Sequence, residues 1–232
     1  MKITFSLFAL SFALGLGLVV PWVAQGQANT NVPDPTLTVP HIAFHDVPIT
    51  IAIENLAPLA ELNNYIIDPK LFVAADGTKK PEPILNLYWQ NYAAVTALAR
   101  VLKENHLVMV TNAFTTVVCI TSTNAVPNPI DAKLLGDDTN GVIPRIVYDD
   151  VPLNIALTTL IGQAHVNAVL DPQVSGEASP APPDFKMTMM PDVSVRWHNL
   201  TARQAIVEIC EVYRLVIVKG SSPNSVVIKY KK

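Results

Sequence analysis

The sequence contains one pattern twice, and this repeat limits what the chain can fold into. Residues 46 to 48 read Asp-Val-Pro, and residues 150 to 152 read the same about a hundred residues later. In both places Ile-Ala follows after two intervening residues, and Asp-Pro closes the pattern, at Asp68 in the first copy and at Asp171 in the second. A unit of this size is too large for a solenoid repeat. The repeat therefore predicts two tandem copies of one small domain.

Composition supports a folded chain with two modest cores. The 232 residues are 50% hydrophobic, which argues against disorder. The net charge is -3 and no basic block occurs, so we expect no nucleic-acid partner.

The N-terminus has the features of an export signal. Lys2 precedes an almost wholly apolar run over residues 3 to 20, and Pro21 ends that run. Residues 24 to 26 and 26 to 28 both place small residues where a signal peptidase requires them. We therefore predict a signal peptide over residues 1 to 28 and a soluble, exported protein. The alternative is an uncleaved anchor, and only then would the chain associate with a membrane.

Hydrophobic spacing predicts the same elements in both copies. Alternating residues 41 to 47 suit a half-buried strand. A helix should follow, with Pro48 at its first position and Asp46 or Val47 at its entry. Its apolar stripe is Ile49, Ala52, Ile53, Leu56 and Ala60, and the second copy repeats it as Leu153, Ala156, Leu157, Leu160 and Ile161. Pro58 should kink the first helix or end it early.

The second half of each copy begins with another strand, marked by Leu85, Leu87 and Trp89 and by Val193, Val195 and Trp197. Asn91 and Asn199 follow, and we expect each to cap a second helix. Thr201 and Gln204 also have the spacing of a capping box. A hairpin should close each copy, with residues 117 to 120 and 226 to 228 as its second arms.

Each copy thus reads strand, helix, strand, strand, helix, strand, strand. This order predicts an α+β fold, with two helices on one face of a small mixed β-sheet. We expect the first domain over residues 39 to 121, a linker over 122 to 142, and the second domain over 143 to 230.

These motifs resemble the short N-terminal domain shared by secretins and TonB-dependent signalling receptors. The second copy carries the family pattern in residues 147 to 153, 167 to 172, 193 to 197 and 199 to 201. The first copy matches more loosely, with Tyr92-Ala93 where the second has Leu200-Thr201. The resemblance covers most of residues 39 to 121 and 143 to 230.

The resemblance implies a bacterial periplasmic module that works by protein contact and is not an enzyme. Secretin domains of this kind stack into rings below an outer-membrane barrel, and receptor domains pass a signal to an inner-membrane regulator. The expected role is part of, or accessory to, an outer-membrane secretion or pilus assembly or a TonB-linked signalling assembly. Envelope proteins are then the expected partners, either secretin-like, TonB-linked or in the inner membrane.

The residues themselves offer no catalytic, cofactor or metal site. His41 and His45 share a strand face, but a third ligand is missing and exposure on an edge strand explains them. Thioethers can bind copper, so Met187, Met189 and Met190 permit an alternative function as a periplasmic small-ligand or metal carrier or sensor. Packing of a proline-rich loop is the simpler interpretation of these methionines.

The acidic pairs and the cysteines have structural interpretations as well. Asp149-Asp150 recurs as His45-Asp46, which indicates a helix start rather than catalysis. Asp137-Asp138 falls in the linker and suits solvation. Cys119 and Cys210 occupy non-equivalent, core-facing positions of different copies, so two buried free thiols are favoured over a disulfide bridge.

Binding by strand addition is the mechanism we expect for protein contact. The candidate sheet edge is the strand over residues 226 to 230, together with its counterpart in the first copy. Lys229, Lys231 and Lys232 equally suit protection of such an edge against pairing.

Overall fold

The computed structural model describes residues 38–73, 78–112, 114–125, 128, 130–136, 141–177 and 190–231. The expected signal peptide, Asp137-Asp138, Met187, Met189 and Lys232 lie outside the described residues.

The first copy runs from β1 to β5. Its elements are β1 (Thr38–Pro48), α1 (Ile49–Leu59), β2 (Tyr65–Ile67), the short 3-10 helix η1 (Pro69–Leu71), β3 (Ile84–Ala93), α2 (Ala94–Glu104), β4 (Leu107–Thr111) and β5 (Val118–Ser122). Pro58 is the second-last residue of α1, which ends one residue later as its position predicts.

The second copy repeats this order after the 3-10 helix η2 (Ala132–Leu135). Its elements are β6 (Ile143–Pro152), α3 (Leu153–Ala164), β7 (Ala168–Leu170), the one-turn helix α4 (Pro172–Ser175), β8 (Asp192–Leu200), α5 (Ala202–Val212), β9 (Leu215–Lys219) and β10 (Val226–Tyr230). The predicted α+β class, the two copies and their βαββαββ order are confirmed.

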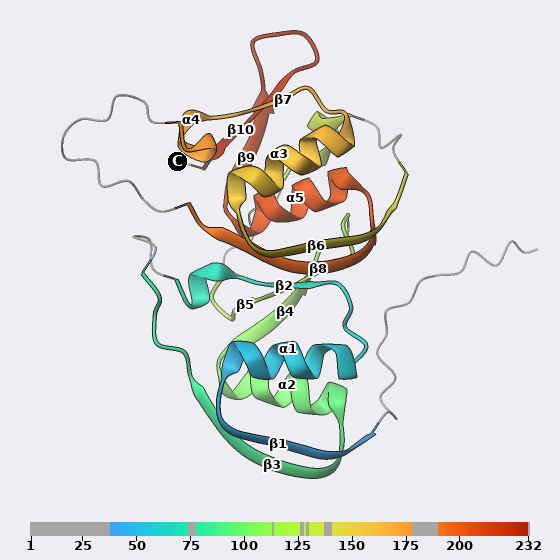
Figure 1. The fold of residues 1–232 in the computed structure, drawn as a ribbon, viewed down its shortest axis with the longest axis vertical. Coiled ribbons are helices and arrows are strands. Elements are labelled where there is room, and N and C mark those ends of the chain that lie inside the picture. Colours follow the sequence, from blue (N-terminus) through green and yellow to red (C-terminus); the bar gives the residue numbers. More distant parts are fainter. Residues whose placement is uncertain are drawn as a thin grey trace, which may run out of the picture. The chain divides into compact units, whose positions relative to one another are not determined.

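The strands of each copy divide between two sheets, where we expected one. In the first copy β1 and β3 form an antiparallel pair, and β2, β5 and β4 form a separate mixed sheet. The second copy has the same division, β6 with β8 and β7 with β10 and β9. Figure 1 shows that the two helices of each copy lie between its two sheets. Both faces of each helix pair are therefore covered.

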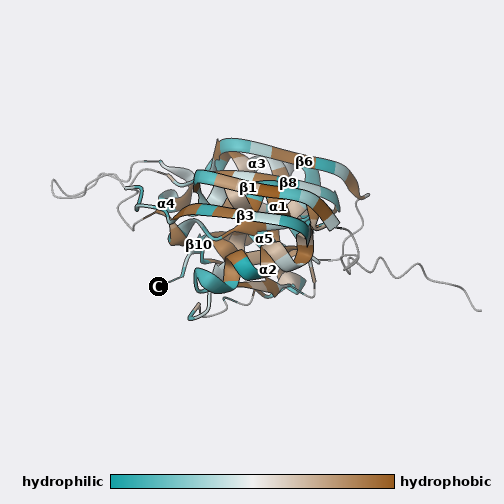
Figure 2. Cartoon of the chain, turned by 90° about the horizontal axis from the view of Figure 1, so that it is seen from below, coloured by the Kyte–Doolittle hydropathy of each residue, from teal (hydrophilic) through white to brown (hydrophobic). Residues whose placement is uncertain are grey.

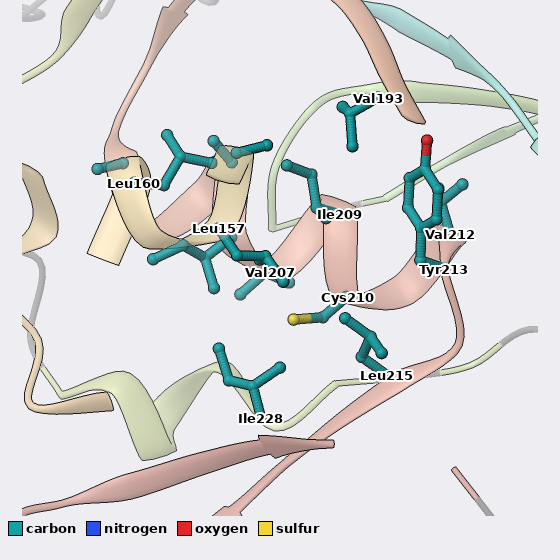
Figure 3. Packing of buried hydrophobic residues seen from close by; sticks show 14 of the residues in the cluster. Leu157, Leu160, Val193, Val207, Ile209, Cys210, Val212, Tyr213, Leu215 and Ile228 are labelled. Atoms are coloured by element: carbon teal, nitrogen blue, oxygen red, sulfur yellow. The ribbon is translucent and has the colours of Figure 1, made fainter. Parts of the chain in front are cut away.

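Each helix pair forms the centre of a hydrophobic core. In the first copy the stripe of α1 packs with Leu98, Val101 and Leu102 of α2. In the second copy the predicted stripe of α3 meets α5 and Trp197, which is fully buried. Figure 3 shows the Cys210 sulfur of α5 among the side chains of Val207, Leu215 and Ile228 in this core.

In the repeated Asp-Val-Pro, the aspartate lies at a strand irregularity and the proline directly precedes the helix. The register between β1 and β3 shifts between Phe44 and Val47, and Asp46 has φ 51°. Asp150 has φ 49° at the corresponding shift in β6. Aspartate tolerates this left-handed conformation better than most residues. The expectation that the acid supports the helix start is wrong, because the helices begin after Pro48 and Pro152 without a side-chain cap.

The cap expected at Asn91 and Asn199 is also wrong. Both residues belong to strands, β3 and β8, and take left-handed φ values of 48° and 55°. The helices begin three residues later, at Ala94 and Ala202. Thr201 caps α5 with the predicted capping box to Gln204, whereas Ala93 stands at the start of α2 with no side-chain cap.

Candidate interaction surfaces

The sheet formed by β2, β5 and β4 contributes side chains to two cores, one on each of its faces. Tyr65, Ile67 and Ile120 pack into the core of the first copy. Between them Ile66 and Cys119 point the other way and join the core of the second copy, together with Val117. Neighbouring residues of a strand face opposite sides, so one sheet serves two cores. The copies are thus held in contact by shared hydrophobic packing within a single compact unit.

A carboxamide clip fixes this contact. Asn64 donates from Nδ2 to the carbonyl oxygen of His198 at 2.9 Å, and its Oδ1 accepts from the backbone N–H of His198 at 2.7 Å. Beside it, Trp197 Nε1 donates to the carbonyl oxygen of Tyr65 at 2.9 Å. Only 8% of Asn64 is exposed, so these bonds satisfy polar groups that water no longer reaches. The amide acts here like a short strand added to the outer edge of β8.

The turn between β4 and β5 reaches α5 of the second copy. Thr115 Oγ1 donates to Glu208 Oε2 at 2.6 Å, and Asn112 Nδ2 donates to Glu211 Oε2 at 2.5 Å. Gln204 Nε2 donates to the carbonyl oxygen of Phe114 at 3.0 Å. Two of these bonds run from donors on the hairpin to carboxylates on the helix, and the third runs from the helix to the hairpin.

Burial changes the titration of both carboxyl groups. Glu208 is 1% exposed, and desolvation raises its pKa to about 7. The hydrogen bond from Thr115 opposes this rise, and the nearby charge of Glu211 adds to it. Desolvation also raises the pKa of Glu211, against the hydrogen bond from Asn112. Both groups belong to the contact between the copies.

Sequence reasoning missed Asn64, Glu208 and Glu211. A glutamate in a helix is usually solvated, and nothing local distinguishes these two. One signal was present in α5, where Gln204, Glu208 and Glu211 at i, i+4 and i+7 form a single polar stripe. The other signal was the repeat, since Asn167 stands before β7 as Asn64 stands before β2.

The expectation of a free sheet edge at residues 226 to 230 is wrong. β10 is the central strand of its sheet, with β7 parallel on one side and β9 antiparallel on the other. β5 is central in the same way. The parallel partner comes from far earlier in each copy, which the hairpin pattern alone does not reveal. Lys229 is therefore half-buried in a central strand rather than guarding an edge.

In the three-stranded sheet of the first copy, β4 is an edge strand. Three consecutive apolar residues in this strand are exposed, Val108 at 37%, Met109 at 41% and Val110 at 41%. β4 pairs with β5 alone, and among the described residues nothing else bonds to its backbone. An uncharged, apolar and exposed edge is a site where another chain can pair.

The corresponding strand of the second copy, β9, is covered. Asn128 Nδ2 donates to the carbonyl oxygen of Leu215 at 3.0 Å, and Lys231 Nζ donates to Asn128 Oδ1 at 3.1 Å. The segment that follows packs on the same core through Ile130, Leu134 and Leu135. Ile217, at the place of Met109, is consequently 6% exposed. The two copies differ most clearly at this edge.

The histidine pair bonds to its own copy. His45 Nδ1 lies 2.8 Å from Asn86 Oδ1, and His41 stacks on Tyr88 with ring centroids 6.2 Å apart. His41 also lines a shallow hollow of about 360 Å³ between β1 and α1, with Phe44, Asn55 and Leu59 among its other lining residues. In the described ranges, no three His, Cys, Asp or Glu side chains come together as a metal site.

The remaining candidates have structural surroundings. Asp150 accepts from Ser194 Oγ at 2.7 Å across the strand pair. Met190 packs over Gly176, which has φ 75°. Cys119 and Cys210 are free thiols, as favoured, but Cys119 faces the core of the second copy rather than its own. Burial raises the pKa of Cys119 to about 12, so its reactive thiolate is scarce at neutral pH.

Within the described residues, no helix combines the length and apolar character needed to cross a membrane. No protein-family model, curated protein or solved structure matches this chain significantly. The likeness to secretin and TonB-receptor N-terminal domains stays a prediction from the sequence.

Proposed function

We propose that this chain is a non-enzymatic, exported periplasmic module that binds another envelope protein at the edge of β4. The observation that carries the proposal is the exposed run Val108, Met109 and Val110 on a strand whose outer edge is unpaired. An extended segment added at this edge would gain backbone hydrogen bonds along the strand and bury these side chains.

The second copy indicates what such a segment would need. There, the segment over residues 128 to 135 covers the equivalent strand with one amide bonded to its backbone and several aliphatic side chains. A partner segment with aliphatic residues and one or more free backbone groups would cover β4 in the same way. The resemblance described above favours a secretin-like, TonB-linked or inner-membrane protein as its source.

The contact between the copies supports this role because it makes the binding strand rigid. The sheet that carries β4 is held from behind by Ile66, Cys119 and the Asn64 clip. A strand held in this way loses little conformational freedom when a partner pairs with it.

Photocrosslinking in living cells tests the proposal. A photoreactive residue at Met109 should give an adduct with an envelope protein, and the same residue at Thr159, exposed on α3, should not. Val110→Lys should abolish the adduct, because a charge on an edge strand prevents pairing. Val110→Thr keeps the strand propensity and should retain it.

Equal adducts from Met109 and Thr159, or none from either, would count against binding at β4. An adduct that survives Val110→Lys would show contact at this surface without strand pairing. Circular dichroism of each variant would establish that the fold is intact.

A further inference from the structure

The contact between the copies uses two complementary surfaces, and each copy carries both. The first copy supplies the donor surface, which consists of Asn64, the outer face of its three-stranded sheet and the hairpin tip. The second copy supplies the acceptor surface, formed by the outer edge of β8 and one side of α5. The donor surface of the second copy and the acceptor surface of the first copy have no such use within the chain.

The donor surface of the second copy retains the parts of the clip. Asn167 occupies the place of Asn64 in the same backbone setting, since its carbonyl oxygen accepts from Val226 N at 2.9 Å as that of Asn64 accepts from Val118 N at 3.0 Å. Asn167 is exposed, and no described residue bonds to its side chain. Its carboxamide is therefore available to bind backbone groups of another chain.

The sheet face beside Asn167 is apolar and open. Val169 replaces the buried Ile66 and is 57% exposed, and Val227 replaces Cys119. Val216 and Val218 continue this face on β9, because their neighbours Leu215 and Ile217 point into the core. Ile66 would be exposed in the same way if the copy that covers it were removed.

The acceptor surface of the first copy retains its parts as well. Trp89 stands for Trp197, and Gln90 pairs with His41 as His198 pairs with Arg145. The matching register directs the backbone N–H and carbonyl of Gln90 toward the outer edge of β3. Asn91 repeats the left-handed turn of Asn199 directly after them. In the described part of the chain, nothing bonds to Trp89 Nε1.

The two acceptor surfaces carry opposite charges. This difference distinguishes the contact within the chain from a contact between two chains. Arg100 and Lys103 of α2 take the places of Glu208 and Glu211. Arg100 bonds to Glu104 at 2.8 Å and lies over the Trp89 ring, against which Tyr92 also stacks. Figure 2 shows hydrophilic bands on α2, where these residues are exposed.

The hairpin tip of the second copy suits these cations. Residues 220 to 225 contain three serines, Asn224 and no basic side chain, so the tip offers hydroxyl and carbonyl acceptors. The tip of the first copy instead offers the donors Asn112 and Thr115 to carboxylates. Hydroxyl and carboxamide groups both donate and accept, so the second tip can present acceptors to these cations as the first presents donors to carboxylates.

We propose that the protein associates with a second copy of itself head to tail. The outer face of β7, β10 and β9 of one chain packs on β3 and α2 of the next. Asn167 clasps the backbone of Gln90, and Trp89 Nε1 donates to the carbonyl oxygen of Ala168. The interface joins two different surfaces, so it extends to a linear or closed assembly rather than stopping at a symmetric dimer.

Sedimentation velocity of the purified chain over a range of concentrations tests this proposal. The wild-type sedimentation coefficient should rise with concentration. Asn167→Ala and Trp89→Phe should each weaken association roughly tenfold, because each leaves backbone groups in the interface without a partner. Asn63→Ala changes an exposed asparagine outside the surface and should behave as wild type. Asn167 is exposed and Trp89 is half-buried against the core of the first copy, and circular dichroism would establish that the variants fold.

A cross-link gives the geometry independently. A Gln90→Cys chain mixed with an Asn167→Cys chain should form a disulfide-linked dimer under mild oxidation, and neither chain alone should do so. A wild-type chain that stays monomeric at every concentration, or an Asn167→Ala variant that associates as wild type, would overturn the proposal. Val110→Lys, which tests partner binding at β4, should leave self-association unchanged. Loss of association in Val110→Lys alone would assign the contact to β4 and overturn the clip.

Discussion

At the scale of single residues, burial places the carboxyl group of Glu208 under the hairpin of the first copy, where its protonation affects stability. Its pKa in the folded chain is about 7, above the ordinary value of 4.5. The folded state therefore holds the proton more tightly than the unfolded state. Stability from this group is complete below about pH 4.5 and is lost as pH rises through about 7.

We expect the free energy of unfolding to fall by on the order of 3 kcal/mol over this interval. Glu208→Gln should remove most of the dependence, because the amide has the same shape and does not titrate. In this variant the free energy of unfolding should still fall with pH, but less steeply, because the pKa of Glu211 is raised too. Urea unfolding at about pH 5 and about pH 8 measures both. An unchanged slope in the Gln variant would place the pH dependence elsewhere.

At the scale of elements, α2 and α5 begin differently although they are equivalent. Thr201 and Gln204 bond to each other's backbone at the start of α5. Ala93, with φ -66° and ψ 128°, has the conformation of a cap without its side chain. One helix therefore carries a stabilising device that its counterpart lacks.

We expect Thr201→Ala to lower the free energy of unfolding by about 1 kcal/mol and Ala93→Ser to raise it by about 0.5 to 1 kcal/mol. Thermal or urea unfolding of the two variants measures this. Thr96→Ala, on the exposed side of α2, serves as the control for helix propensity. A destabilised Ala93→Ser variant would mean that this half-buried position does not accept a hydroxyl.

Elements were predictable from the sequence where side-chain spacing alone decides them. The stripes of α1 and α3 and the alternation ending at Trp197 were correct because each follows one local period. The pairing of β2 with β5 was not visible, because parallel partners lie far apart in the chain. The roles of Asn64 and Glu208 also depend on a distant segment, so their local patterns matched an ordinary loop and an ordinary helix face. The bulge at Asp46 was missed because a proline two residues later equally suits a helix start.

At the scale of the whole molecule, the shared packing couples the stability of the two copies. Ile66, Val117 and Cys119 leave the second core if the first copy unfolds, and Glu208 then loses Thr115. Unpaired buried groups of this kind cost more than the bonds themselves contribute. The copies should therefore unfold together rather than in sequence.

Hydrogen exchange of the native protein measures this coupling directly. Amides of Leu98 in α2 and Ile206 in α5 should exchange with free energies of opening that agree within about 1 kcal/mol. Asn64→Ala should lower both, whereas Asn63→Ala should lower neither. A core amide of one copy that exchanges several kcal/mol more easily than its counterpart would show that the copies open independently.

The clip at Asn64 also has a consequence for how this sequence can diverge. Asn64 binds main-chain atoms of residue 198, so the grip does not depend on the histidine side chain, which is exposed. Position 198 can drift through many amino acids without loss of the contact. Position 64 cannot, because only a carboxamide donates and accepts side by side in this way. Selection that preserves the contact between the copies should therefore act on position 64 and leave position 198 nearly neutral.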